Sequence, residues 1–96
     1  MTTDEDQSLT PIQEICLRIG FHLLKADFIQ RIISDSTAIF SKDELEWKMI
    51  RLDNEVKVLR DNKQVLAFED GKFILRSAIQ CEEPEFWSYL KELIND

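Results

Sequence analysis

The residues best suited to nucleophilic catalysis in this 96-residue chain are its one histidine, His22, and its two cysteines, Cys16 and Cys81. Nucleophilic catalysis needs a histidine beside a serine or cysteine, with an acid to orient it. Cys16 and His22 are six residues apart on a predicted helix, so they point to different sides. We therefore predict no catalytic residue, and interpret His22 as a core or boundary residue and Cys16 as a small core residue.

Metal-binding patterns are absent as well. The two cysteines have neither the C-x-x-C spacing nor the histidine partners of a zinc site, and no disulfide framework follows from so few of them. A calcium loop that began at Asp53 would place Lys57 where an oxygen ligand belongs and Val58 where glycine belongs. We predict no metal, no cofactor and no enzymatic activity.

The net charge of −7 argues against nonspecific binding to nucleic acid or to anionic lipid. It suits a basic protein partner, or a partner for which charge is unimportant. The longest apolar region, 12–33, carries too many charged residues for a membrane span. The acidic N-terminus lacks the features of a signal peptide. We expect a cytoplasmic protein with a disordered acidic tail, 1–8, and one small domain, 9–96.

A helix start is predicted at Thr10, because Pro11 suits a first turn and Gln13 can complete a capping box. One set of apolar residues then follows at helical spacing, and a second set lies on another side of the helix: Leu17, Phe21, Leu24 and Phe28. A helix that is apolar on more than one side is expected to be wrapped by its neighbours. Gly20 either allows a close approach or divides this N-terminal helical region into two helices.

A second helix start is predicted at Ser41, where Glu44 completes the S-x-x-E pattern and Phe40 can pack on Leu45. The pattern predicts a long central helix over 42–62. Its residues at 4-3-4-3 spacing form an apolar stripe: Leu45, Met49, Leu52, Val56 and Leu59. At 100° per residue, a second set falls on the opposite side: Trp47, Ile50, Asn54 and Val58.

Two apolar faces on one helix suggest a partner surface, because a chain of this length has few elements to cover both. In one interpretation the stripe faces the core and the opposite set binds a partner, with Trp47 as an anchor. In another the stripe itself is the interface. An equally good alternative is that both faces are covered by other elements of the same protein.

Asp70-Gly71 predicts a two-residue turn in a β-hairpin over 65–75. Each pair of residues that this turn aligns is chemically compatible, from Glu69 opposite Lys72 to Phe68 opposite Phe73. A C-terminal helix is predicted to begin near Pro84, with acidic residues at its positive end.

The predicted fold is therefore mainly helical α+β: an N-terminal helical region, a long central helix, one hairpin and a C-terminal helix. The alternative is a winged-helix arrangement, in which 42–62 divides into two helices and 65–75 forms the wing. The expected function is a non-enzymatic protein-binding module, such as an adaptor, chaperone-like factor or inhibitor, that acts as a homodimer or docks on a protein partner. A winged-helix transcriptional regulator that binds DNA is the alternative, although the charge makes nucleic acid an unfavourable partner.

Overall fold

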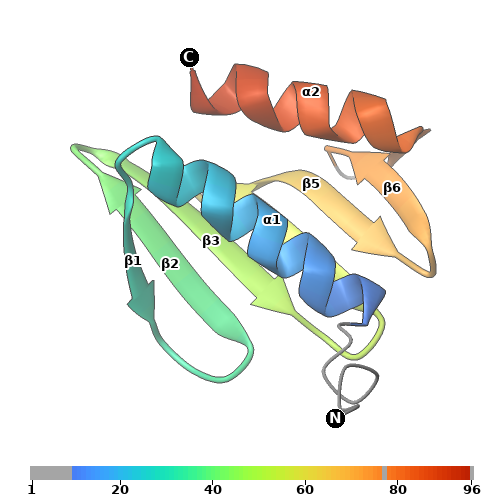
Figure 1. Ribbon diagram of the computed structural model, residues 1–96, viewed down its shortest axis with the longest axis horizontal. Coiled ribbons are helices and arrows are strands. Elements are labelled where there is room, and N and C mark those ends of the chain that lie inside the picture. Colours follow the sequence, from blue (N-terminus) through green and yellow to red (C-terminus); the bar gives the residue numbers. More distant parts are fainter. Residues whose placement is uncertain (1–9, 77, 96) are drawn as a thin grey trace, which may run out of the picture.

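The computed structural model describes residues 10–76 and 78–95 (Figure 1). The described chain forms two helices with seven strands between them. Their bounds are α1 (Pro11–Lys25), β1 (Ile29–Ile32), β2 (Thr37–Lys42), β3 (Leu45–Arg51), β4 (Glu55–Arg60), β5 (Lys63–Glu69), β6 (Lys72–Leu75), β7 (Ile79–Cys81) and α2 (Glu83–Ile94). The predicted tail, 1–8, lies outside the described residues.

The strands form one antiparallel sheet in which every strand pairs with the strand that follows it in sequence. This order leaves β1 at one edge and β7 at the other. Helix α1 contacts β3 and β4, α2 contacts β6, and the two helices contact each other. Figure 1 shows α1 lying across the sheet with α2 beside it near β6. None of the helices described is long and apolar enough to cross a membrane.

The predicted long central helix is wrong, because 42–62 contains the end of β2, all of β3 and all of β4. Ser41 does not cap a helix; it is paired with Glu46 across the β2–β3 hairpin. The 4-3-4-3 spacing arose because two strands of alternating residues are separated by a short turn. A mainly helical fold and the winged-helix arrangement are therefore both wrong.

The β2–β3 and β4–β5 turns carry no glycine or proline, so the usual sequence signals of a turn are missing there. Asp43, Asp61 and Asn62 have φ values of 56°, 53° and 69°. Asp and Asn tolerate this left-handed region better than other residues with side chains, because their short polar groups can bond locally to the backbone. These two turns lie near the two ends of 42–62, the segment for which a helix was predicted.

The predicted start of the N-terminal helical region is correct, but the helix ends before Phe28, which was predicted to lie on it. The Thr10 hydroxyl accepts from the Gln13 amide at 3.2 Å, and the Gln13 side chain accepts from the Thr10 amide at 2.9 Å. Helix α1 ends at Lys25, and 29–32 forms β1. Gly20 lies inside the helix and does not divide it. A Cβ at Gly20 would stand 3.5 Å from the Phe40 ring, so the glycine permits close packing.

The predicted hairpin register agrees with the pairing of β5 with β6, in which Glu69 pairs with Lys72 and Phe68 with Phe73. Asp70 and Gly71 have φ values of 52° and 77°, as a type I′ turn requires. This hairpin is nevertheless one part of a seven-stranded sheet, so the description of one hairpin packed on helices is wrong.

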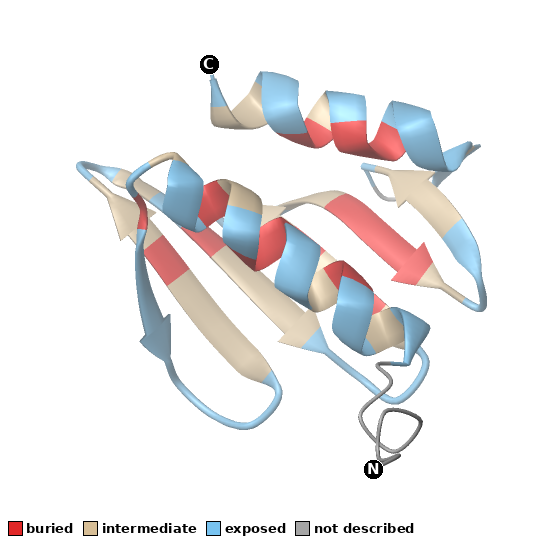
Figure 2. Ribbon diagram, viewed as in Figure 1, coloured by how far each residue is buried: buried red, intermediate tan, exposed pale blue. Residues whose placement is uncertain are grey.

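The core lies between the two helices and one face of the sheet, and Figure 2 shows buried residues on both helices and on the strands. Strand alternation sends every second side chain to this face. The other face has no helix over it in Figure 2 and carries half-buried aliphatic residues beside two lysines: Ile39, Ile50, Leu59, Ile74, Lys48 and Lys57. Antiparallel sheets commonly have one solvated face of this kind.

Candidate binding surface

The four residues predicted to contact a partner do not share a surface. Trp47 and Val58 are buried in the core, and the Trp47 ring packs edge-on against Phe28 with centroids 6.3 Å apart. Ile50 lies on the uncovered sheet face, and Asn54 lies exposed in the turn between β3 and β4. Their common side existed only on the predicted helix. Trp47 has no exposed area with which to anchor a partner.

The alternative stripe is divided in the same way. Val56 is buried, and Leu45 and Met49 pack against the core. Leu59 lies on the uncovered face opposite Lys48, and Leu52 lies exposed after the end of β3. The sheet therefore sends members of both predicted sets to both of its faces.

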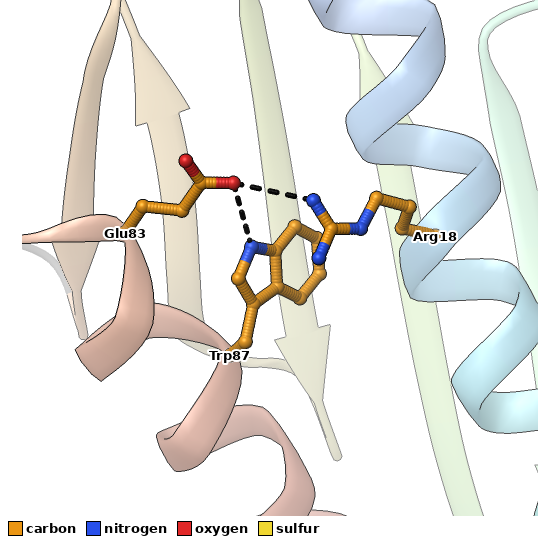
Figure 3. Close-up of polar contacts among 3 residues, drawn as sticks. All are labelled: Arg18, Glu83 and Trp87. Carbon is orange, nitrogen blue, oxygen red and sulfur yellow. Dashed lines mark hydrogen bonds and ion pairs between the residues drawn. The ribbon is translucent and has the colours of Figure 1, made fainter.

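A polar cluster joins the two helices (Figure 3). Arg18 Nη1 of α1 and Trp87 Nε1 of α2 both donate to Glu83 Oε2, at 3.2 and 3.1 Å. The Arg18 guanidinium carbon lies 4.1 Å from the centre of the Trp87 ring. The ion pair is about half exposed on both sides and worth at most about 1 kcal/mol. The cluster orients α1 on α2 and presents no nucleophile.

Both thiols have raised pKa values. Burial raises the pKa of Cys16, against a smaller lowering by Arg51. Burial and two nearby glutamates raise the pKa of Cys81. Protonated thiols are poor nucleophiles. In 10–76 and 78–95, no group of three or more histidine, cysteine, aspartate or glutamate residues is placed to hold a metal ion.

Large apolar side chains are exposed at eight described positions, and six of these lie between residues 17 and 33. Four of the six lie on the side of the molecule that carries α1 and define what we call the α1–β1 surface: Leu17, Phe21, Leu24 and Ile32. Ile29 and Ile33 belong to the opposite, uncovered face of the sheet, because side chains alternate along β1. The sequence had singled out the first three residues of this surface as a second apolar side of the helix. The expectation that neighbours would wrap that side is wrong for these three residues, and only Phe28 of that set is buried.

Helix phase and the edge position of β1 explain this exposure. Helix α1 turns Ile15, Ile19 and Leu23 into the core. At 100° per residue, Leu17 and Phe21 then lie on the outer side. All four residues of β1 are exposed, because β1 has a neighbour on one side only and projects beyond the cover of α1 (Figure 2).

An open groove of about 180 Å³ lies between α1 and the β1–β2 hairpin. Cys16 of α1 and Ile32 of β1 line it together with Ala38 and Met49. Ile32 belongs both to the groove and to the α1–β1 surface, so the two are continuous. Residues 17–33 carry three basic groups and one acidic group, although the whole chain is acidic.

A larger cavity, of about 940 Å³, lies at the start of α1 beside the turns that follow β3 and β5. Its volume suits a small molecule. Its polar residues, including Arg51, Asp53 and Asp70, are all exposed, however. A ligand site normally has a few polar groups that converge in an enclosed apolar space. The α1–β1 surface is the stronger candidate.

No family model matches this chain, and comparison with curated proteins and with solved structures finds no match either. Any proposal about function therefore depends on the chain's own surface.

Proposed function

We propose that this chain is a non-enzymatic protein-binding module that docks its partner, a second copy or another protein, on the α1–β1 surface. The observation that carries the proposal is the concentration of exposed large apolar side chains on one helix side and the adjacent edge strand. Soluble proteins rarely expose a large contiguous apolar area unless it serves as an interaction site.

Burial of such a surface contributes free energy that favours association. Full burial of one leucine, isoleucine or phenylalanine side chain contributes about 1.5–3 kcal/mol. Association costs about 4–15 kcal/mol in lost translational and rotational freedom. The four side chains of the surface are between 47% and 75% exposed, so their burial under a partner offsets the lower part of that cost.

The character of the surface favours a protein over nucleic acid. Proteins that bind single strands combine basic grooves with several aromatic residues on which bases stack. The α1–β1 surface is aliphatic except for Phe21. The acidity of the whole chain favours a basic partner at long range. Lys25 and Arg31 suit acidic groups at the contact itself.

A cytoplasmic location belongs to the same proposal and is supported by two unpaired half-buried thiols.

The test is a quantitative capture experiment with wild-type protein, Phe21→Lys and a control, Ser88→Lys. Both variants add one positive charge at an exposed helix position, but Ser88 lies on α2, outside the α1–β1 surface. Proteins bound from a lysate of the source organism are cross-linked and identified, with the chain itself counted as a possible partner. Circular dichroism melts verify that all three proteins are folded.

We expect at least one protein that wild type and Ser88→Lys retain and Phe21→Lys loses. If everything captured binds equally to all three proteins, the surface is not a docking site and the proposal fails.

A further inference from the structure

We propose that the partner docked on the α1–β1 surface is another protein, which pairs an extended strand with β1, and that this strand alternates apolar with acidic residues. This inference rests on the proposed function and deepens it, because it names the contact and the chemistry of the partner. It is argued from the main chain of β1, from the apolar side chain on its helix side and from the charge on its other side.

One edge of β1 presents main-chain groups that no strand of the described sheet reaches. The Ile33 amide donates to the Thr37 carbonyl at 3.1 Å, so Ile33 bonds toward β2. Bonding direction alternates along an antiparallel strand. Arg31 therefore also bonds toward β2, whereas the N–H and C=O groups of Gln30 and Ile32 point away from the sheet. An added strand satisfies such a row of donors and acceptors.

The helix side of this edge is apolar. Ile32 pairs with Ala38, which packs against the core, so the Ile32 side chain lies on the face that carries α1. Ile32 is 75% exposed, and Leu24 of the same surface is 47% exposed. The residues of an added strand that lie opposite Gln30 and Ile32 point to this face as well. We therefore expect apolar side chains at those positions of the partner strand.

The other side of this edge is basic. Arg31 pairs with Ile39, and Ile39 pairs with Lys48, so the three side chains form one row on the uncovered face. Arg31 is exposed and makes no ion pair with any described residue. The partner residue opposite Arg31 points to this face, where a carboxylate would lie across from the guanidinium. Because successive residues of a strand alternate between faces, apolar and acidic residues must alternate in the partner.

The same charge argues against a second copy of this chain as the added strand. An antiparallel pair of two β1 strands can be centred beside Gln30, Arg31 or Ile32. Centred beside Arg31, it places the two guanidinium groups directly opposite each other, and in the other two registers they lie on a diagonal. Like charges repel at both positions, and a charge on an edge strand is a common barrier to self-pairing. Arg31 therefore disfavours a second copy and favours an acidic strand.

Selection from a library of displayed linear peptides tests strand addition. Wild-type protein is the target, and peptides that also bind Ile32→Pro are removed. Ile32→Pro eliminates an outward N–H that makes no bond within the sheet, and proline is tolerated at such edge positions. We expect the selected peptides to alternate apolar and acidic residues. A synthetic copy should bind wild type and Ile32→Val equally and Ile32→Pro about tenfold more weakly in fluorescence anisotropy.

A charge exchange tests the acidic preference. Arg31→Glu should weaken binding of the acidic peptide, whereas Lys63→Glu, an equal change of charge at an exposed position of β5, should not. A version of the peptide with lysine in place of its acidic residues should bind Arg31→Glu more tightly than it binds wild type. Circular dichroism melts verify that each variant is folded.

The outcomes separate this inference from the proposed function. Strand addition is overturned when no selected peptide distinguishes Ile32→Val from Ile32→Pro. Binding that Arg31→Glu leaves unchanged overturns the acidic partner. A wild-type dimer in sedimentation velocity that Ile32→Pro dissociates overturns it too, because a second copy is then the added strand. The capture experiment with Phe21→Lys decides independently whether the surface docks a protein.

Discussion

At the scale of single residues, Trp47 shows the difference between an interface anchor and a core residue most directly. Its side chain has no exposed area, and its indole N–H has no hydrogen-bond partner among the described residues. A buried donor without a partner costs about 1–3 kcal/mol. The ring contributes packing area that outweighs this cost, because it lies against Phe28 in the centre of the core.

We predict that Trp47→Ala lowers the free energy of unfolding by about 3–5 kcal/mol, through lost burial and the cavity left behind. Trp47→Phe should cost much less, because it retains an aromatic ring and removes the unpartnered donor. Denaturant unfolding monitored by circular dichroism measures both. A Trp47→Ala protein with wild-type stability would show that the residue is not in the core.

A second prediction at this scale concerns His22. Burial and the neighbouring cations Lys91, Arg18 and Lys25 lower its pKa below the ordinary value of 6.5. The unfolded chain therefore binds a proton more readily than the folded one at pH values just below 6.5. The contribution of His22 to stability is complete above that pH and declines as the pH falls toward the folded pKa.

The measurement is the unfolding free energy of wild type and of His22→Gln on both sides of pH 6.5. We expect wild type to lose more unfolding free energy than His22→Gln as the pH falls. Carboxylates also titrate in this range, but they are the same in both proteins, so their contribution cancels in the difference. An unchanged difference would mean that the folded protein does not disfavour the charged imidazole.

At the scale of elements, the turns decide the fold. The β5–β6 turn has Gly71 at φ 77°, and a Cβ built there meets no atom within 4 Å. Any cost of a side chain at Gly71 is therefore conformational. Asp43, Asp61 and Asn62 make comparable turns without glycine, at the energetic cost that a left-handed residue carries.

We predict that Gly71→Val destabilises the protein by about 1–2 kcal/mol, because a β-branched residue is strained at positive φ. Gly71→Asn serves as the control and should cost less, since asparagine tolerates this region. Thermal melts of the two variants provide the comparison. Equal losses would show that something other than backbone conformation limits this position.

At the scale of the whole molecule, the main asymmetry is that the helices cover one sheet face only. Val58 and Ile50, which the sequence analysis assigned to one side of a helix, lie on opposite faces of the sheet. The covered face contributes most of the hydrophobic stabilisation, because its side chains are removed from water completely.

We therefore predict that Val58→Ala lowers the unfolding free energy by about 2 kcal/mol. Ile50→Ala should cost less, although isoleucine loses more atoms than valine does. Chemical denaturation of the two variants in parallel gives the comparison. A larger loss for Ile50→Ala would indicate that the second face is also covered, and sedimentation would then show whether a partner covers it.

The parts of this protein that depend on neighbouring residues could be read from its sequence. The capping box at Thr10 and Gln13, the Asp70-Gly71 turn with its register and the C-terminal helix after Pro84 are all set within a few residues along the chain. Each involves hydrogen bonds or dihedral preferences that need no distant contact. The outer apolar side of α1 was visible in the sequence for the same reason.

The tertiary structure alone decided what 42–62 would become and which apolar residues remain exposed. The same spacing of Leu45, Met49 and Val56 fits one helix or two strands, and local preference cannot separate them. The sheet wins because its main-chain groups find partners in β2 and β5, which lie on either side of β3 and β4. The tertiary structure also decided that Leu17, Phe21 and Ile32 are exposed, because an apolar side chain is buried only where another element covers it.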